Sequence, residues 1–176
     1  MDNEGNAAIE FALITPIFAV ILACGVDLAL LVYSRFQLEA TVSNCASYAL
    51  IKTEMVDSKN GSDLATKIAT MIASEDTAGD TQASVVVNNG AIADYNGAKI
   101  LVYGRTSQAD ACYCPKGSGS SLSWGGSQTC GSACPDGGQA GKYVAISVTQ
   151  AFTPLLSGFG IVSADSVRAN AVVRTR

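Results

Sequence analysis

Four cysteines in the second half of the chain are the residues best suited to do chemistry. One residue separates Cys112 from Cys114, three separate Cys130 from Cys134, and a Gly- and Ser-rich stretch lies between the pairs. Four thiolates can hold zinc, but zinc sites typically begin with cysteines two to four residues apart. In an exported domain, paired cysteines become disulfides instead. A bridge between Cys112 and Cys114 would be strained, so we expect each to bond one of Cys130 and Cys134.

The composition gives little support to catalysis. The chain has no His, which removes the usual general base and the commonest metal ligand. Nucleophile-elbow, phosphate-loop and metal-binding motifs are missing from the sequence, and so is the C-x-x-C pair of redox sites. The net charge is −4 and the 11 Lys and Arg residues are scattered, so no basic stripe is available for phosphates. We expect no enzyme activity, cofactor, metal, small-molecule substrate or nucleic acid.

A long apolar segment near the N-terminus is the first element that must position these residues. It runs for 23 residues from Phe11 to Tyr33 with Asp27 as its one charged residue. As a helix it is about 34 Å long, which exceeds the roughly 30 Å of a bilayer core. The segment therefore predicts a membrane-spanning helix rather than a helix of a soluble core. Within it, Cys24 is expected to be a small buried apolar residue.

Helical spacing continues beyond this segment, with Phe36, Cys45 and Ala49 on a less polar face. The pattern predicts that the helix protrudes from the membrane and ends near residues 60–61, Asn-Gly, which form a good stop signal. A second helix is expected over residues 64–75, capped by Ser62 or Asp63. For Cys45, the sequence leaves open a free thiol, a contact with the domain and a link between subunits.

The second half of the chain has a β pattern. Val-, Ile- and Tyr-rich runs at residues 83–89, 98–105, 142–152 and 165–175 are separated by turn residues. Two of these runs alternate apolar and polar residues, which is typical of an antiparallel sheet with one solvated face. Residues 115–141 form a long loop that needs something to hold it, and Tyr113 and Trp124 either pack over the disulfides or form a recognition surface.

The residues that precede the apolar segment have a distinctive spacing. Gly5 is followed by four residues, then by Glu10, Phe11 and an apolar helix that contains Pro16. This arrangement resembles the processing site of type IV prepilins, specifically the G-x-x-x-x-E-F form of TadE-like pseudopilins from tight-adherence (Flp) pilus systems. Further similarity at residues 33–50, 111–118, 129–134, 142–155 and 166–174 extends the resemblance over nearly the whole chain.

By that resemblance, a prepilin peptidase cuts between Gly5 and Asn6. Glu10 then helps to register a new subunit through the free N-terminus of a neighbour. A carboxylate at the edge of an apolar span is costly unless it is paired, and a partner amine would pair it. The implied function is that of a minor pilin or pseudopilin, a structural subunit for assembly of a pilus used in adhesion and surface colonisation. Its implied partners are the inner membrane, the peptidase, other pilins and the assembly machinery.

The resemblance and the patterns together predict an α+β, pilin-like fold in which a long helix packs on a small antiparallel sheet. The expected parts are a leader at 1–5, a transmembrane segment at 6–33, a protruding helix at 34–60 and an exported domain at 61–176 with a cysteine loop at 112–134. The expected location is the bacterial inner membrane, crossed once, with the C-terminal domain in the periplasm and incorporation into an extracellular pilus left open.

Two features leave alternatives. Residues 1–4 are acidic where such leaders carry Lys or Arg, and Arg35 after the span favours a cytoplasmic domain by the positive-inside rule. Because of the cysteines, we expect the domain to be exported. Either a basic leader further upstream or machinery that overrides the charge bias would then account for the acidic residues 1–4. Asp27 either sits at the membrane interface or contacts another subunit, and Pro16 is either a tolerated kink or a point of local bending. A permanently anchored periplasmic binding or adhesion module that never polymerises is the alternative function.

Overall fold

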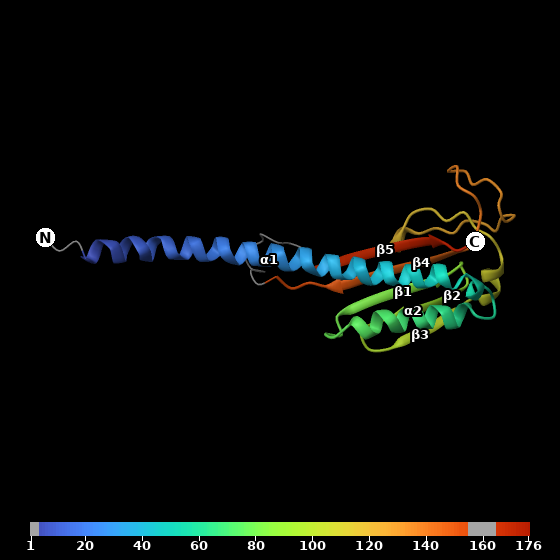
Figure 1. The fold of residues 1–176 in the computed structure, drawn as a ribbon, viewed down its shortest axis with the longest axis horizontal. Coiled ribbons are helices and arrows are strands. Elements are labelled where there is room, and N and C mark those ends of the chain that lie inside the picture. Colours follow the sequence, from blue (N-terminus) through green and yellow to red (C-terminus); the bar gives the residue numbers. More distant parts are fainter. Residues whose placement is uncertain (1–3, 155–164) are drawn as a thin grey trace.

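The computed structural model describes residues 4–154 and 165–176 and has an elongated shape (Figure 1). A helix of 48 residues projects from a compact α+β domain, and the sheet has five antiparallel strands in the order β3-β2-β1-β4-β5. This confirms the predicted fold class. The elements are α1 (Glu4–Ile51), η1 (Thr53–Met55), α2 (Gly61–Glu75), β1 (Thr81–Val87), β2 (Ala91–Tyr95), β3 (Ile100–Gly104), η2 (Thr106–Asp110), η3 (Gly119–Ser121), β4 (Tyr143–Ala151) and β5 (Ser166–Arg174).

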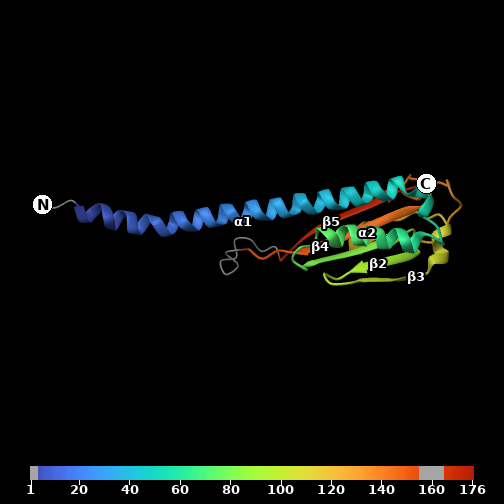
Figure 2. The same ribbon diagram turned by 60° about the horizontal axis from the view of Figure 1, so that its bottom comes forward.

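Both helices pack on one face of the sheet (Figure 2). The C-terminal half of α1 lies on β4 and β5, while α2 lies on β1 and β2. The predicted alternation is confirmed in β4, where Val144, Ile146 and Val148 are buried in the core. The opposite face of β4 meets the disulfide-bearing loop, because Leu122 and Ala145 line the same small hollow. The helices therefore cover one face of the sheet, and the loop covers part of the other face near β4.

The end of α1 differs from the prediction. The helix stops at Ile51, and a 3-10 turn and a loop separate it from α2, so the expected single helix up to residue 60 is wrong. Val56 is buried in the core, which requires the chain to turn inward at this point. The Asp57 carboxylate then accepts hydrogen bonds from the backbone N–H groups of Lys59 and Asn60. These side-chain bonds hold the loop between the two helices in a non-helical conformation.

The start of α2 also differs from the prediction. Asn60 occupies the N-cap position and Gly61 is the first helical residue, so Ser62 and Asp63 lie inside the first turn and do not cap the helix. Gly61 is buried, and a β-carbon added there would lie 3.4 Å from a methyl group of Val87. Close packing of α2 on β1 thus sets where the helix begins.

Strand β2 was not predicted from the sequence. It is short, and it forms a hairpin with β1 in which Val85 pairs with Ala93. The turn between them contains two residues with positive φ, Asn88 at 47° and Asn89 at 58°. Asn tolerates this left-handed conformation better than most residues. The dipeptide before Gly90 was therefore an overlooked hairpin signal.

Candidate assembly and processing site

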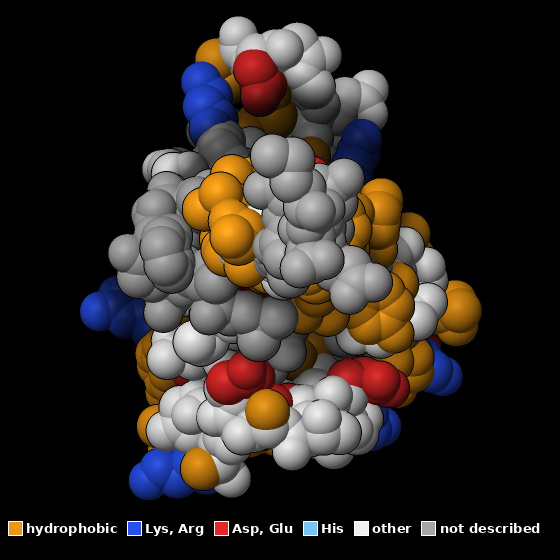
Figure 3. All heavy atoms as spheres, turned by 90° about the vertical axis from the view of Figure 1, so that its left-hand side faces the viewer, with side chains coloured by type: hydrophobic (Ala, Val, Ile, Leu, Met, Phe, Trp, Pro, Cys, Tyr) orange, Lys and Arg blue, Asp and Glu red, His pale blue; other side chains and the backbone are white. Residues whose placement is uncertain are grey.

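The N-terminal half of α1 is an apolar rod that extends beyond the folded domain, although Asp27 is buried and Leu31 packs against the core. Its large side chains, from Ile9 to Phe36, are mostly exposed. Within the described residues, α1 is the one helix long and apolar enough to cross a membrane. Seen from the N-terminal end of α1, hydrophobic side chains are visible on two sides of the tip of the helix (Figure 3). Exposed apolar surface of this extent marks a contact with lipid or with another protein.

The predicted processing motif lies at the free tip of this rod. Residues 1–3 of the expected leader lie outside the described residues, and the Gly5–Asn6 peptide lies in the first turn of α1. Glu10 and Phe11 are exposed on the next turns. The first buried core residue of α1 is Leu38, 28 residues beyond Glu10 and so about 42 Å along the helix axis. The domain therefore does not shield the motif.

Pro16 is accommodated within α1 without a break in the helix. A proline has no N–H to donate to the preceding turn and normally kinks a helix. Here the Thr15 hydroxyl donates a 2.7 Å hydrogen bond to the Phe11 carbonyl oxygen, one of the groups close to the altered turn. Whether this point bends during assembly stays a prediction.

Asp27 is the one acid within the rod beyond Glu10, and it is buried. Only 1% of its surface is exposed, whereas its neighbours Val26 and Leu28 are exposed. Glu10 and Asp27 are 17 residues apart, or about 26 Å along the axis. The residues predicted to act in assembly are therefore spread along α1 and do not form one cluster.

The C-terminal half of α1 belongs to the core. Leu38, Val42, Ala46 and Ala49 pack against the sheet and α2. Cys45 is a free thiol, buried to 1% exposure in the same layer. Of the three options that the sequence left open for Cys45, the structure therefore shows two together, a free thiol and a contact with the domain. Cys24, in the apolar rod, is also free and is partly buried.

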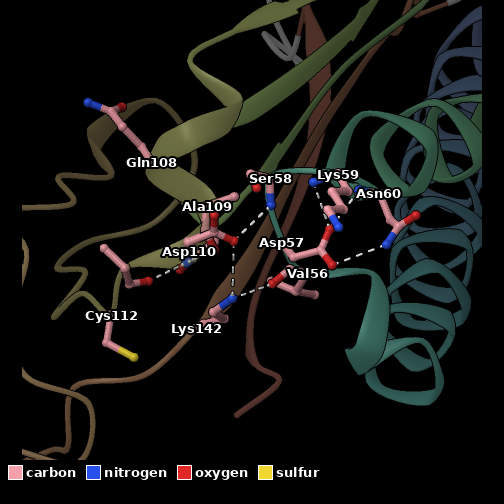
Figure 4. A network of polar contacts seen from close by, with 12 residues as sticks. Val56, Asp57, Ser58, Lys59, Asn60, Gln108, Ala109, Asp110, Cys112 and Lys142 are labelled. Carbon is pink, nitrogen blue, oxygen red and sulfur yellow. Dashed lines mark hydrogen bonds and ion pairs between the residues drawn. The ribbon is translucent and has the colours of Figure 1, made fainter.

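A polar network holds the turn between α1 and α2 (Figure 4). The Lys142 ammonium group donates a 2.7 Å hydrogen bond to the Val56 carbonyl oxygen and lies 4.0 Å from the Asp110 carboxylate. Asp110 also accepts a 3.0 Å hydrogen bond from the Ser58 backbone N–H. Hydrogen bonds from Ser58 lower the pKa of Asp110, and those from Asn60 lower the pKa of Asp57. The α1–α2 turn is thereby tied to β4 and η2.

Two disulfides hold the long loop at the end of the domain far from the N-terminal tip of α1 (Figure 1). Cys112 bonds Cys130 and Cys114 bonds Cys134, with Cα–Cα distances of 5.1 and 5.7 Å. This confirms that each cysteine of the first pair bonds one of the second. Within residues 4–154 and 165–176, no three His, Cys, Asp or Glu side chains are grouped as a metal site would require.

The aromatic residues of the loop pack on each other. Tyr113 lies between Cys112 and Cys114 in the sequence and is buried. Its ring makes an edge contact with the ring of Trp124 at a centroid distance of 5.9 Å. Asn88, which was not singled out in the sequence, anchors the start of this loop. Its amide donates to the carbonyl oxygens of Ala109 and Ala111, and its side-chain oxygen accepts from the Tyr143 backbone N–H.

A comparison with known protein families gives a match at the N-terminal end of the chain. Residues 5–47 match the TadE-like protein family, a family associated with the tight-adherence pilus system. No curated protein and no solved structure matches the chain. The matched stretch contains the processing motif, the apolar rod and the first part of α1 that packs on the sheet. Over residues 5–47, the chain is therefore similar to TadE-like proteins.

Proposed function

We propose that the protein is a minor pilin or pseudopilin of a tight-adherence pilus, a structural subunit with no enzymatic activity. One observation carries the proposal. The apolar half of α1 extends far beyond its own domain and begins with the Gly5, Glu10 and Phe11 motif. Such a rod needs an apolar environment, and lipid before assembly and sister rods after it would both supply one. The role in adhesion and surface colonisation follows from that of the pilus.

Cleavage between Gly5 and Asn6 would create a new α-amino group one helical turn before Glu10. The Glu10 side chain is exposed on the isolated chain, so it is accessible to a group on another subunit. In an apolar setting, a lone carboxylate is costly and gains by pairing with an amine. The pairing would thus favour one axial register between adjacent rods.

We place the α+β domain in the periplasm. Two disulfides support this side of the membrane, because they persist in oxidising compartments and are rare in the cytosol. The α2–β1 connection, which holds Asp76 and Asp80 and follows Glu75 at the end of α2, lies at the end of the domain that faces the apolar rod (Figure 1). An acidic end gains nothing from an anionic lipid surface. Because the domain surface would not bind the lipid, the helix alone would hold the domain at the membrane.

The test is intact-mass analysis of membrane-extracted protein together with pilus counts. Wild-type protein should lack residues 1–5, and Glu10→Ala should reduce pili at least tenfold while the domain remains folded. Glu39→Ala is the matched control, because Glu39 lies on the same helix and its one ion pair among the described residues is with Arg35 on an exposed surface. Exposed pairs of this kind contribute about 0.3–0.5 kcal/mol, so pili should be unaffected.

An uncleaved N-terminus with unchanged pili in Glu10→Ala would contradict the proposal. That result would favour a permanently anchored periplasmic binding or adhesion module. The rod would then serve as an anchor alone, and any single-pass apolar helix of equal length should replace residues 6–33 without loss of function.

A further inference from the structure

Strand β3 exposes apolar side chains that no described part of the chain covers. Among the described residues outside α1, the exposed large hydrophobic side chains are three consecutive ones: Leu101 at 49%, Val102 at 46% and Tyr103 at 53%. Tyr103 and Leu101 lie on the face of the sheet away from the helices, and Val102 lies on the helical side. Apolar surface is thus available on both faces of one strand.

The same strand is an edge of the sheet. It pairs with β2 on one side and is the last strand in the order on that side. An edge strand presents unpaired backbone N–H and C=O groups, and natural proteins usually blunt it with charges or cover it. The other edge, β5, is treated in that way, because α1 packs on it and the charged side chains of Arg168 and Arg174 are exposed. No comparable cover protects β3 within the described structure.

The charges that flank β3 indicate what would pair with it. Lys99 lies directly before the strand and Arg105 directly after it, and both are exposed. Neither has an ion-pair partner among residues 4–154 and 165–176. If a second copy paired through β3 in antiparallel register about Val102, Lys99 of one copy would oppose Arg105 of the other. Like charges directly opposite each other are destabilising, so a second copy is a poor occupant.

We propose that β3 is a docking strand for an extended, apolar segment of a different protein that carries acidic residues at both ends. The partner strand would extend the sheet by main-chain hydrogen bonds, and its acidic ends would pair with Lys99 and Arg105. The Tyr103 hydroxyl donates to the Asp94 carboxylate, which orients the ring beside Ile92 of β2. This contact is independent of cleavage and of Glu10, so it goes beyond the function proposed above.

The test uses the full chain in phosphatidylcholine nanodiscs and two blocked synthetic peptides, EVTVTVE and KVTVTVK. Their central residues are identical and have β propensity, so they differ only in terminal charge. The Glu-ended peptide should bind about tenfold more tightly than the Lys-ended one, since two attractive charge pairs replace two repulsive ones. Bound peptide should slow amide hydrogen exchange in residues 100–104.

Charge-reversal variants provide the control. The double variant Lys99→Glu with Arg105→Glu should invert the preference between the peptides, whereas Arg168→Glu on the opposite edge should leave it unchanged. Val102→Lys should weaken binding of both peptides at least tenfold. Unchanged thermal unfolding of each variant would show that the domain remains folded.

Three results would overturn the proposal. They are an absence of binding by either peptide, equal affinity for both, and exchange protection outside residues 100–104. Self-association of the unliganded protein with protection on β3 would assign the edge to a second copy and would overturn the proposal as well. None of these results bears on N-terminal cleavage or pilus counts, so the proposed assembly role is tested independently of the β3 proposal.

Discussion

The two halves of α1 place their apolar side chains in different surroundings. Val20 and Leu22 in the first half are exposed, whereas Leu38 and Val42 in the second half are buried against the sheet. The halves also differ in composition, because residues 11–33 contain one charged residue whereas residues 34–51 mix polar residues with a single apolar face. The second half has a partner within the chain and the first half does not, so the first half must obtain its partner from a membrane or from other subunits. One continuous helix thereby packs into the core of its own domain with one half and into surroundings outside the chain with the other.

The largest expected effect is on the buried half. Val42→Asp places an uncompensated carboxylate in the core and should lower the free energy of unfolding by about 3–5 kcal/mol. Ser43→Asp is the matched control, because Ser43 is the next residue of the same helix and is exposed. It should change stability by less than about 0.5 kcal/mol. Urea unfolding of detergent-solubilised full-length protein measures both, and equal losses would show that α1 is not docked as described.

The exposed half should respond in the opposite way. Val20→Asp should leave urea unfolding of the domain unchanged but cost about 2.5–3.5 kcal/mol of membrane insertion. The fraction that resists alkaline extraction from membranes reports insertion, and Val20→Leu is the control. If Val20→Asp destabilised the domain as much as Val42→Asp does, the comparison between the halves would fail.

The turn that ends the buried half should show a smaller effect. Lys142→Met removes the hydrogen bond to the Val56 carbonyl oxygen and the contact with Asp110. A hydrogen bond to a charged group contributes about 1.5–3 kcal/mol, so the midpoint of urea unfolding should fall accordingly. Lys67→Met on the exposed face of α2 controls for loss of charge. A neutral result for Lys142→Met would mean that the core alone positions the turn.

The smallest expected effect is on the stability of the domain at acidic pH, and it comes from one carboxylate of the domain. Burial disfavours ionisation of Asp76, but hydrogen bonds from Tyr95, Gly79 and Thr81 outweigh it and lower its pKa. A carboxyl with a depressed pKa stabilises the fold above its unfolded pKa of about 3.9, and this stabilisation is lost as the pH falls through the folded pKa. Asp76→Asn should therefore lose about 1–2 kcal/mol at neutral pH.

The variant should also lose less additional stability than wild type on acidification. Asp63→Asn, at an exposed position in the first turn of α2, is the control and should follow wild type. Urea midpoints at neutral and acidic pH measure the difference. Parallel pH profiles for wild type and Asp76→Asn would contradict the role given to this carboxylate.

Strands and helices were predicted correctly where the spacing of apolar residues fits only one kind of secondary structure. The alternating residues of β4 and the long apolar run of α1 were found because their periods match a half-buried strand and a helix. Strand β2 was overlooked because it is short and contains Asp94, and its signal lies in the turn residues Asn88 and Asn89. Turn chemistry of this kind is recognised only when the turn is considered together with both neighbouring strands.

The end of α1 shows what local signals leave undecided. Nothing in residues 52–60 forbids a helix, and the Asn-Gly pair at 60–61 is a plausible stop. The helix ends earlier because Val56 is drawn into the core and Lys142, 86 residues away, binds its carbonyl oxygen. A contact across that separation has no counterpart in a local window of sequence.

From the order of the residues alone, one can infer the apolar rod, the processing motif and the need for disulfides, because each depends on neighbours or on simple spacing. The folded chain was needed to pair Cys112 with Cys130 and to bury Cys45. It was also needed to leave β3 as an uncovered edge. These features depend on which distant segments come together, and free energy summed over many long-range contacts decides that.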